Sequence, residues 1–148
     1  MGWLLDTGVL LRLYDRDAPE RDDILRSLRV IFQRGEQIFV AMQNIAEFWN
    51  VMTRPMDVNG FGQSTETARR RLQSIEKYAT ILTESDDSYR LWKQFVDELV
   101  ITGVKVHDAR LVAVMTANGV TQLLTFNERD FRRFDSIVVV PPAKLVSQ

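Results

Sequence analysis

The segment Trp3-Leu4-Leu5-Asp6-Thr7-Gly8-Val9-Leu10-Leu11 decides the fold class of this chain. Its first residues form a short apolar run, and we predict a buried strand over residues 3–6 that ends at Asp6. Residues 7–14 follow without a linker and are predicted to form a helix. An apolar strand that passes straight into a helix is typical of an α/β fold with a parallel sheet.

The same alternation of strand and helix continues to the end of the chain. Further strands are predicted over residues 37–41, 80–83, 122–125 and 137–140. Helices are predicted from Asp17 to Gly35, around Ile45 to a stop at Pro55, from Ser64, from Ser85 or Asp86, and from Asp108 to Gly119. Strands joined by helices need crossover connections, so we expect a three-layer α/β/α sandwich with a mostly parallel central sheet. No repeat or linker divides the chain, so residues 1–148 are expected to form one domain with its core at about 3–140.

Apolar residues at helical spacing predict which helix faces point to the core. For the helix that ends at Gly35, the predicted inner face is Ile24, Leu25, Leu28, Ile31 and Phe32. For the helix that starts near Ser85, it is Tyr89, Trp92, Phe95, Val96, Leu99 and Val100. Trp49 and Trp92 lie on such stripes and are expected to be core residues. Phe61, which stands between two glycines, is freer to stack on a ligand.

The composition excludes several kinds of site. The chain has no cysteine and one histidine, which excludes disulfides, thiolate zinc sites, a cysteine nucleophile and sites with several histidines. No segment reaches the roughly 20 apolar residues that a membrane helix needs, so we expect a cytoplasmic protein with no membrane partner. The 19 Lys and Arg nearly balance the 20 Asp and Glu, which permits a nucleic-acid partner without requiring one.

Four acids fall near one edge of the predicted sheet. Asp6 ends the first strand, Glu47 lies in the helix after the second strand, Asp108 opens a late helix, and Asp130 follows the strand over 122–125. Ligands of such sheets bind beyond the carboxyl ends of the strands. Taken singly, Asp6 and Asp108 are also good helix caps, Glu47 an exposed helix residue and Asp130 a turn former.

Taken together, the four carboxylates predict a metal site. Crowded carboxylates repel one another and raise each other's pKa unless a cation neutralises them. Mg²⁺ or Mn²⁺ suits an all-oxygen ligand set and keeps bound water for a substrate. Such a site can activate water against a phosphodiester bond without any side-chain nucleophile. Thr7 and Thr125 are candidates to hold the ligand carboxylates by hydrogen bonds, although local capping and strand propensity explain them equally well.

With these segments in view, the sequence resembles PIN-domain ribonucleases of the VapC kind, the toxins of VapBC toxin–antitoxin pairs. The resemblance rests on four segments that span almost the whole chain: Leu4-Leu5-Asp6-Thr7-Gly8-Val9-Leu10-Leu11, Asn44-Ile45-Ala46-Glu47-Phe48, His107-Asp108-Ala109-Arg110-Leu111-Val112-Ala113 and Leu123-Leu124-Thr125-Phe126-Asn127-Glu128-Arg129-Asp130-Phe131. It implies a metal-dependent endoribonuclease with Asp6, Glu47 and Asp108 in the metal site. It also implies a homodimer and a cognate antitoxin that inserts a segment near the acids.

Two positions depart from the family pattern. Gly8 stands where members usually carry Asn or Ser, a side chain that helps to orient the acids. Asn127 stands where the family often has Asp, so we assign the fourth acid to Asp130 and keep Asn127 as a neutral contributor. For an RNA path, the candidates are Arg12, Arg110, Arg129, Arg132 and Arg133. His107 is either a capping or packing residue or a contact to phosphate or to Asp108.

Other functions remain as alternatives. A haloacid-dehalogenase-like phosphatase would need a second Asp at position 8, where Gly8 stands. A receiver-like phosphoacceptor domain would need paired acids at the first strand and a Lys at the end of a late strand, and Lys144 comes only after Pro141-Pro142. A PIN-like module that binds RNA or a partner protein without cutting is favoured by Gly8 and opposed by the four acids.

Overall fold

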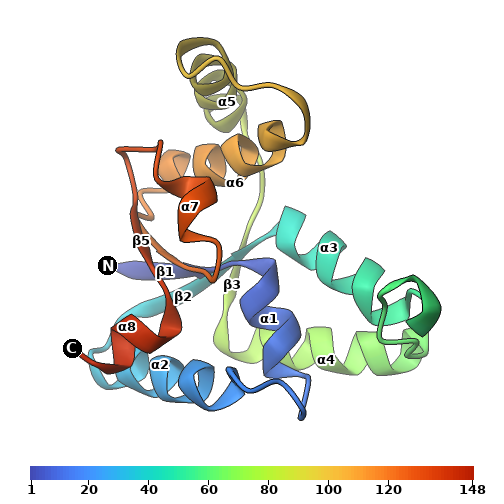
Figure 1. The fold of residues 1–148 in the computed structure, drawn as a ribbon. Coiled ribbons are helices and arrows are strands. Elements are labelled where there is room, and N and C mark those ends of the chain that lie inside the picture. Colours follow the sequence, from blue (N-terminus) through green and yellow to red (C-terminus); the bar gives the residue numbers. More distant parts are fainter.

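The computed structural model describes residues 1–148 and has a five-stranded, fully parallel sheet at its centre (Figure 1). The strands are β1 (Gly2–Leu5), β2 (Gln37–Ala41), β3 (Thr80–Leu82), β4 (Gln122–Leu124) and β5 (Val138–Val140), in the order β3-β2-β1-β4-β5. The first strand therefore lies in the middle, and its Leu4 pairs with Phe39 of β2 and Leu123 of β4. A strand in the middle of a parallel sheet is buried on both faces and therefore needs an apolar sequence. The segment that opens the chain provides one.

Helices make every connection between strands that follow one another in the sequence. They are α1 (Thr7–Leu13), α2 (Arg21–Gln33), α3 (Met42–Thr53), α4 (Thr65–Tyr78), α5 (Asp86–Glu98), α6 (Val106–Ala117), α7 (Glu128–Phe131) and α8 (Pro142–Val146), with short 3₁₀ turns at Met56–Val58 and Gly103–Lys105. The expected α/β fold, with a parallel sheet covered on both faces, is confirmed.

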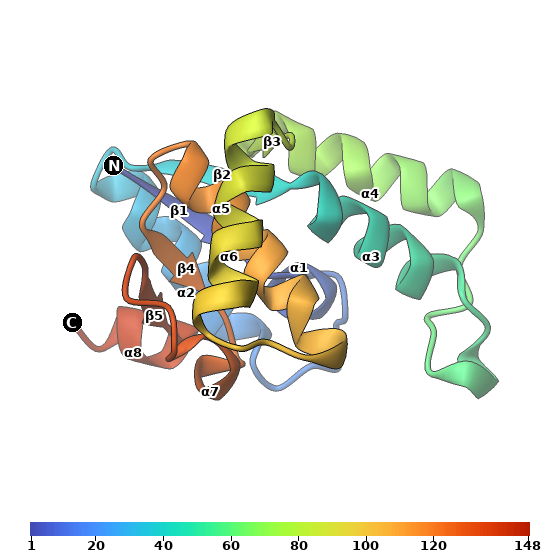
Figure 2. The same ribbon diagram turned by 90° about the horizontal axis from the view of Figure 1, so that it is seen from above.

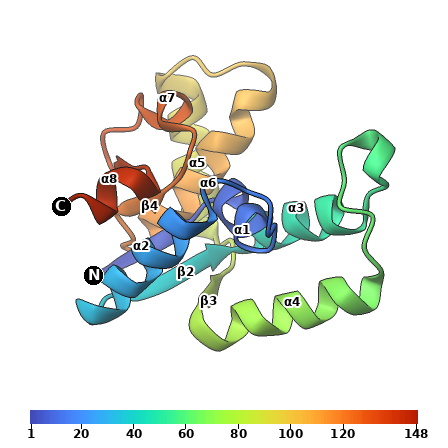
Figure 3. The same cartoon turned by 60° about the horizontal axis from the view of Figure 1, so that its bottom comes forward.

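The sheet separates two apolar clusters, one under each layer of helices. One cluster joins the sheet to α1, α2, α3, α4 and α8, and the other joins it to α6 and α7, with α5 packed outside them. Figure 1 shows these two layers above and below the strands. Figures 2 and 3 show that α3 and α4 extend sideways from the sheet as an arm. No helix of the chain is both long and apolar enough to cross a membrane.

The apolar spacing overestimated how much of two helices is buried. Leu25 and Phe32 of α2 are 37% and 53% exposed, and Tyr89 of α5 is 59% exposed. Both helices lie in outer layers, where only a narrow stripe meets the neighbouring element. Leu99 and Val100 lie beyond the end of α5, and Val100 has a φ of 51°, which takes the chain out of the helix. Trp92 is half-buried, as is Trp49.

Three boundaries also differ from those expected. The helix predicted from Asp17 begins only at Arg21, because residues 16–20 form turns. The helix predicted to open at Asp108 begins at Val106, so Asp108 lies in its first turn and does not cap it. Thr125 lies just after β4 rather than within it. The last two shifts matter for the site described next.

Candidate active site

Asp6 lies at the carboxyl end of the central strand, where both of its carboxylate oxygens are held by hydrogen bonds. It is the N-cap of α1, and Oδ1 accepts from the Thr7 backbone N–H at 2.8 Å. Oδ2 accepts from the Thr125 hydroxyl at 2.7 Å. This contact follows from the sheet, because Leu5 pairs with Leu124 at the ends of β1 and β4, so the residues that come next are neighbours. Asp6 is thus both a cap and a member of the cluster described below.

A hydrogen-bonded chain joins the start of α1 to α3. The Thr7 hydroxyl donates to Glu47 Oε2 at 2.6 Å and accepts from Asn44 Nδ2 at 3.1 Å. Asn44 is buried, and its Oδ1 accepts from the Ala41 backbone N–H at 2.9 Å. Glu47 itself is exposed, so the buried amide and hydroxyl orient a carboxylate that faces solvent. The sequence analysis gave Asn44 no role. The signal that could have identified it is that a polar residue stands on the buried side of an amphipathic helix.

Lys105 stands between the other two acids. Its Nζ lies 2.6 Å from Asp130 Oδ1 and 3.9 Å from Asp108 Oδ2. The 3₁₀ turn that ends at Lys105 brings its ammonium to the start of α6, and α7 brings Asp130 from beyond β4. The sequence reading missed Lys105, because nothing in its spacing distinguishes it from a surface lysine. Its charge offsets part of the repulsion between these two carboxylates.

The pKa shifts connect the acids into one cluster. Burial raises the pKa of Asp6, the Thr125 and Thr7 hydrogen bonds oppose that rise, and the charges of Glu47 and Asp130 add to it. Burial and the charges of Asp130 and Asp6 likewise raise the pKa of Asp108, whereas Lys105 and Arg133 lower it. Carboxylates that shift one another's pKa lie within electrostatic range. The structure therefore gathers Asp6, Glu47, Asp108 and Asp130 at one edge of the sheet.

The donors of this cluster fit a hard divalent cation. All are carboxylate oxygens, and the burial of Asp6 beside like charges makes a positive ion favourable there. In their present hydrogen-bonded positions, no three acidic or histidine side chains close around a single point. Asp130 would have to exchange the Lys105 ammonium for an ion. The carboxylates that would bind an ion thus lie near one another, but hydrogen bonds and an ion pair to other side chains hold them in place.

The remaining candidates lie around the cluster. Arg12 donates to the Gly8 carbonyl at 3.2 Å, and its guanidinium lies 4.5 Å from the Phe126 ring centroid. A Cβ on Gly8 would come 2.9 Å from Arg12 Nη1, so the absence of a side chain at position 8 makes room for this arginine. Asn127 donates its backbone N–H to the Thr125 hydroxyl at 3.0 Å, and its side chain is exposed.

His107 and Arg129 are both exposed. The carbonyl of His107 accepts from Gln43 Nε2 at 3.0 Å, and the same nitrogen donates to Glu47 Oε1 at 3.2 Å. His107 therefore helps to join α3 to α6 through its backbone. Phe61, in the connection between α3 and α4, is partly buried against an apolar cluster, which does not fit the expectation of a free ring for stacking.

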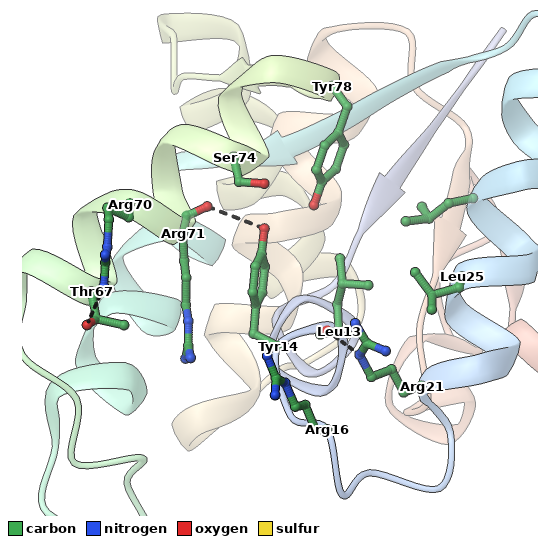
Figure 4. A pocket seen from close by; sticks show the side chains of 11 residues that line it. Leu13, Tyr14, Arg16, Arg21, Leu25, Thr67, Arg70, Arg71, Ser74 and Tyr78 are labelled. Carbon is green, nitrogen blue, oxygen red and sulfur yellow. Dashed lines mark hydrogen bonds between the residues drawn. The ribbon is translucent and has the colours of Figure 1, made fainter.

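A separate cavity of about 550 Å³ lies between α1, α2 and α4 (Figure 4). Arg16, Arg21, Arg70 and Arg71 line it without any carboxylate. Figure 4 shows the Tyr14 hydroxyl directed to the Arg71 carbonyl, to which it donates at 3.4 Å. The cavity begins at the C-terminal end of α1, whereas Asp6 caps the other end. It therefore does not belong to the carboxylate cluster.

Without metal, we expect Asp6 to make the stability of the protein fall with rising pH. Its pKa is near 3.8 in an unfolded chain and higher in the folded chain. Between these values the folded state binds more protons, so the free energy of unfolding decreases as the pH rises through that window. Asp6→Asn removes this contribution. In urea unfolding with EDTA from about pH 4 to about pH 8, the variant should gain stability over wild type as the pH rises, until the difference levels off.

The matched control for this experiment is Glu76→Gln, an exposed position on α4 in the arm. It reports what the loss of one negative charge does outside the cluster. A difference between Asp6→Asn and wild type that shrinks with rising pH would contradict the sign of the Asp6 shift.

Comparison with known proteins places this site in a family. The PIN domain matches residues 3–137, and no curated protein matches the chain. The fold is similar to that of VapBC2 from Rickettsia felis bound to a promoter DNA fragment, with a TM-score of 0.75, 16% identity, and coverage of 95% of this chain and 98% of that one. It is also similar to FitAcB from Neisseria gonorrhoeae, with a TM-score of 0.74, 16% identity and the same coverage of both chains.

The sarcin–ricin loop cleaving toxin VapC20 from Mycobacterium tuberculosis has a TM-score of 0.64, 13% identity, and coverage of 90% of this chain and 95% of that one. At such identities these structures establish the fold alone. The family match covers most of the chain and agrees with the resemblance seen in the four sequence segments. This chain belongs to the PIN domain family.

Proposed function

We propose that this protein is a divalent-metal-dependent endoribonuclease and the toxin of a toxin–antitoxin pair. The observation that carries the proposal is the position of Asp6: a buried carboxylate at the end of the central strand, within electrostatic range of Glu47, Asp108 and Asp130. Crowding like charges is unfavourable, and the capping of α1 by Asp6 does not require Glu47, Asp108 and Asp130 to lie nearby. In a PIN domain, the reaction that such a carboxylate cluster fits best is cation-assisted hydrolysis of a phosphodiester bond.

In this proposal the acids hold the ion, and their neighbours hold the acids. Asp6, Glu47, Asp108 and Asp130 would bind Mg²⁺ or Mn²⁺, which activates water and offsets the charge that develops on phosphate. The Thr125 and Thr7 hydroxyls fix the orientation of Asp6 and Glu47. Lys105 would release Asp130 to the ion.

The substrate would approach over the exposed side of the cluster. Arg12 and Arg129 are proposed to contact the RNA backbone there, since a guanidinium binds phosphate through paired donors. His107 and Asn127 are exposed beside the acids and are proposed as weaker polar contacts.

The proposed assembly and cellular setting follow the related proteins. Two of the similar structures are a VapBC complex and a toxin–antitoxin complex from Klebsiella pneumoniae, which supports a cognate antitoxin for this chain. A homodimer, a cytoplasmic location and a single domain over residues 1–148 complete the proposal.

A second candidate is a PIN module that binds RNA or a protein without cutting. The ion pair between Lys105 and Asp130 favours it, because the ammonium occupies an oxygen that an ion would need. The two candidates differ in what they do to RNA when a divalent ion is supplied.

The deciding experiment incubates the purified protein with structured and single-stranded RNAs in Mg²⁺ or Mn²⁺, and again in EDTA. We expect internal cuts with metal, none with EDTA, and recovery when excess Mg²⁺ is returned. Cutting that survives EDTA would exclude the proposed metal dependence. RNA binding without fragments under every condition would establish the module that binds without cutting.

A further inference from the structure

A second hollow lies at the same edge of the sheet as the carboxylate cluster. Its volume is about 420 Å³, which is within the range of small-ligand sites. Tyr89 and Trp92 of α5 form one wall, Arg110 of α6 another, and Glu84 and Asp86 contribute carboxylates. Glu84 comes two residues after β3, so the hollow stands beyond the carboxyl end of a strand, as the cluster does. Sequence reasoning expected both aromatic rings to point inward and therefore did not find it.

Arg110 connects the hollow to the cluster. It lies two residues after Asp108 in α6, and its Nε donates to Glu84 Oε1 in an ion pair. Because α6 carries both Asp108 and Arg110, a polymer with one phosphodiester at the acids would bring a neighbouring nucleotide towards the hollow.

The aromatic wall is built to present a flat face. The Tyr89 and Trp92 rings are nearly parallel, at 24°, with their centroids 6.4 Å apart. The Trp92 indole N–H donates to the Val106 carbonyl at 2.9 Å, which fixes that ring against α6. Tyr89 is 59% exposed, so its ring remains open on the solvent side. An exposed aromatic ring that lies against a fixed one can serve as a platform on which an unpaired base stacks.

The charges around the hollow favour a base over a phosphate. Glu84 and Asp86 outnumber Arg110, and Asp86 forms no ion pair. The hydroxyls of Ser85 and Ser88 accept each other's backbone N–H groups in the cap of α5. The Asp86 carboxylate is left to accept hydrogen bonds, and Arg110 keeps donors beyond the Nε that contacts Glu84. The edge of a nucleobase carries both donors and acceptors, which such a mixed lining can meet.

We infer that this hollow binds a nucleobase of single-stranded RNA, stacked on Tyr89. The inference rests on the proposed function, since the RNA is the substrate whose backbone would lie at the acids. It adds a base-binding site on α5 and α6 to the proposed cleavage site at the end of β1 and on α3, α6 and α7.

The test measures binding separately from cleavage. Anisotropy of end-labelled oligo(A), oligo(C) and oligo(U) is recorded with the Asp6→Asn protein, in which cleavage is expected to be about 10²–10³-fold slower. We expect all three to bind. Adding Tyr89→Ala should weaken oligo(A) binding about 5- to 150-fold, the loss of one stacked base. Tyr89→Phe keeps the ring and should keep the affinity.

Phe32→Ala is the matched control, because Phe32 is 53% exposed on α2, outside the hollow. Unchanged affinity in Tyr89→Ala overturns the inference. If wild type cuts RNA with Mg²⁺ while Tyr89→Ala binds normally, the base site fails and the proposed function stands. If wild type neither binds nor cuts RNA, both fail together.

Discussion

Asp6→Asn is expected to lower RNA cleavage by about 10²–10³-fold, the usual cost of removing one preorganised group that stabilises charge in a transition state. The amide has nearly the same shape as the carboxylate, but it lacks the negative charge that would hold an ion. The substitution also relieves the burial of a charge beside Glu47 and Asp130, so the metal-free fold should not suffer. Initial rates on a labelled RNA in saturating Mg²⁺ measure the effect.

Two measurements make this prediction specific. Binding of Mg²⁺, followed by calorimetry, should weaken in Asp6→Asn, and the circular dichroism spectrum should match that of wild type. Glu76→Gln on the arm should cut at the wild-type rate. If Asp6→Asn also cuts at the wild-type rate, the carboxylate cluster is not the active site.

Thr125→Val is expected to lower cleavage by about 10–100-fold, although Thr125 is not proposed to bind the ion. Thr125 is fully buried, and its hydroxyl donates to Asp6 Oδ2 at 2.7 Å. Valine fills the same space without a donor. Because this hydrogen bond lowers the pKa of Asp6, its loss should raise that pKa further and move the acidic limb of the pH–rate profile to higher pH.

Thr125→Ser provides the control, since serine keeps the hydroxyl and should restore most of the rate. It also keeps an acceptor for the Asn127 backbone N–H. A merely structural role for Thr125 would lower the rate of Thr125→Val without moving the pH profile. An unchanged rate and profile would show that Asp6 needs no orienting partner.

Much of the fold could be predicted because its signals are local. An apolar run such as Trp3–Leu5 predicts a strand buried on both faces wherever it pairs. The order of strands and helices then requires crossovers, and crossovers require a parallel sheet. The place of Asp6 at the carboxyl end of a strand follows from the sequence alone. That such ends share one edge is a property of all parallel sheets, so a cluster of acids there could be expected as well.

Other features depended on contacts that no local pattern encodes. Tyr89 has the spacing of a core residue, yet α5 lies in an outer layer and leaves its ring in solvent. Lys105 has the appearance of a surface lysine until the 3₁₀ turn and α7 bring it to 2.6 Å from Asp130. Asn44 and Thr7 share a hydrogen bond across 37 positions of sequence. Each of these three features depends on how helices and strands pack against one another. The spacing of residues within one helix or strand gives no information about that packing.

The sequence by itself determined the class of fold and the family, and it predicted four acids at one edge of the sheet, since these follow from residue type and strand order. Only the tertiary structure decided how each acid is held, which cation stands between two of them, and that a base-sized hollow opens beside Arg110. The physical reason is that side-chain partners are chosen by distance in space. Periodicity along the chain predicts which face of a helix or strand is buried, but it does not predict which residues of other elements that face will contact.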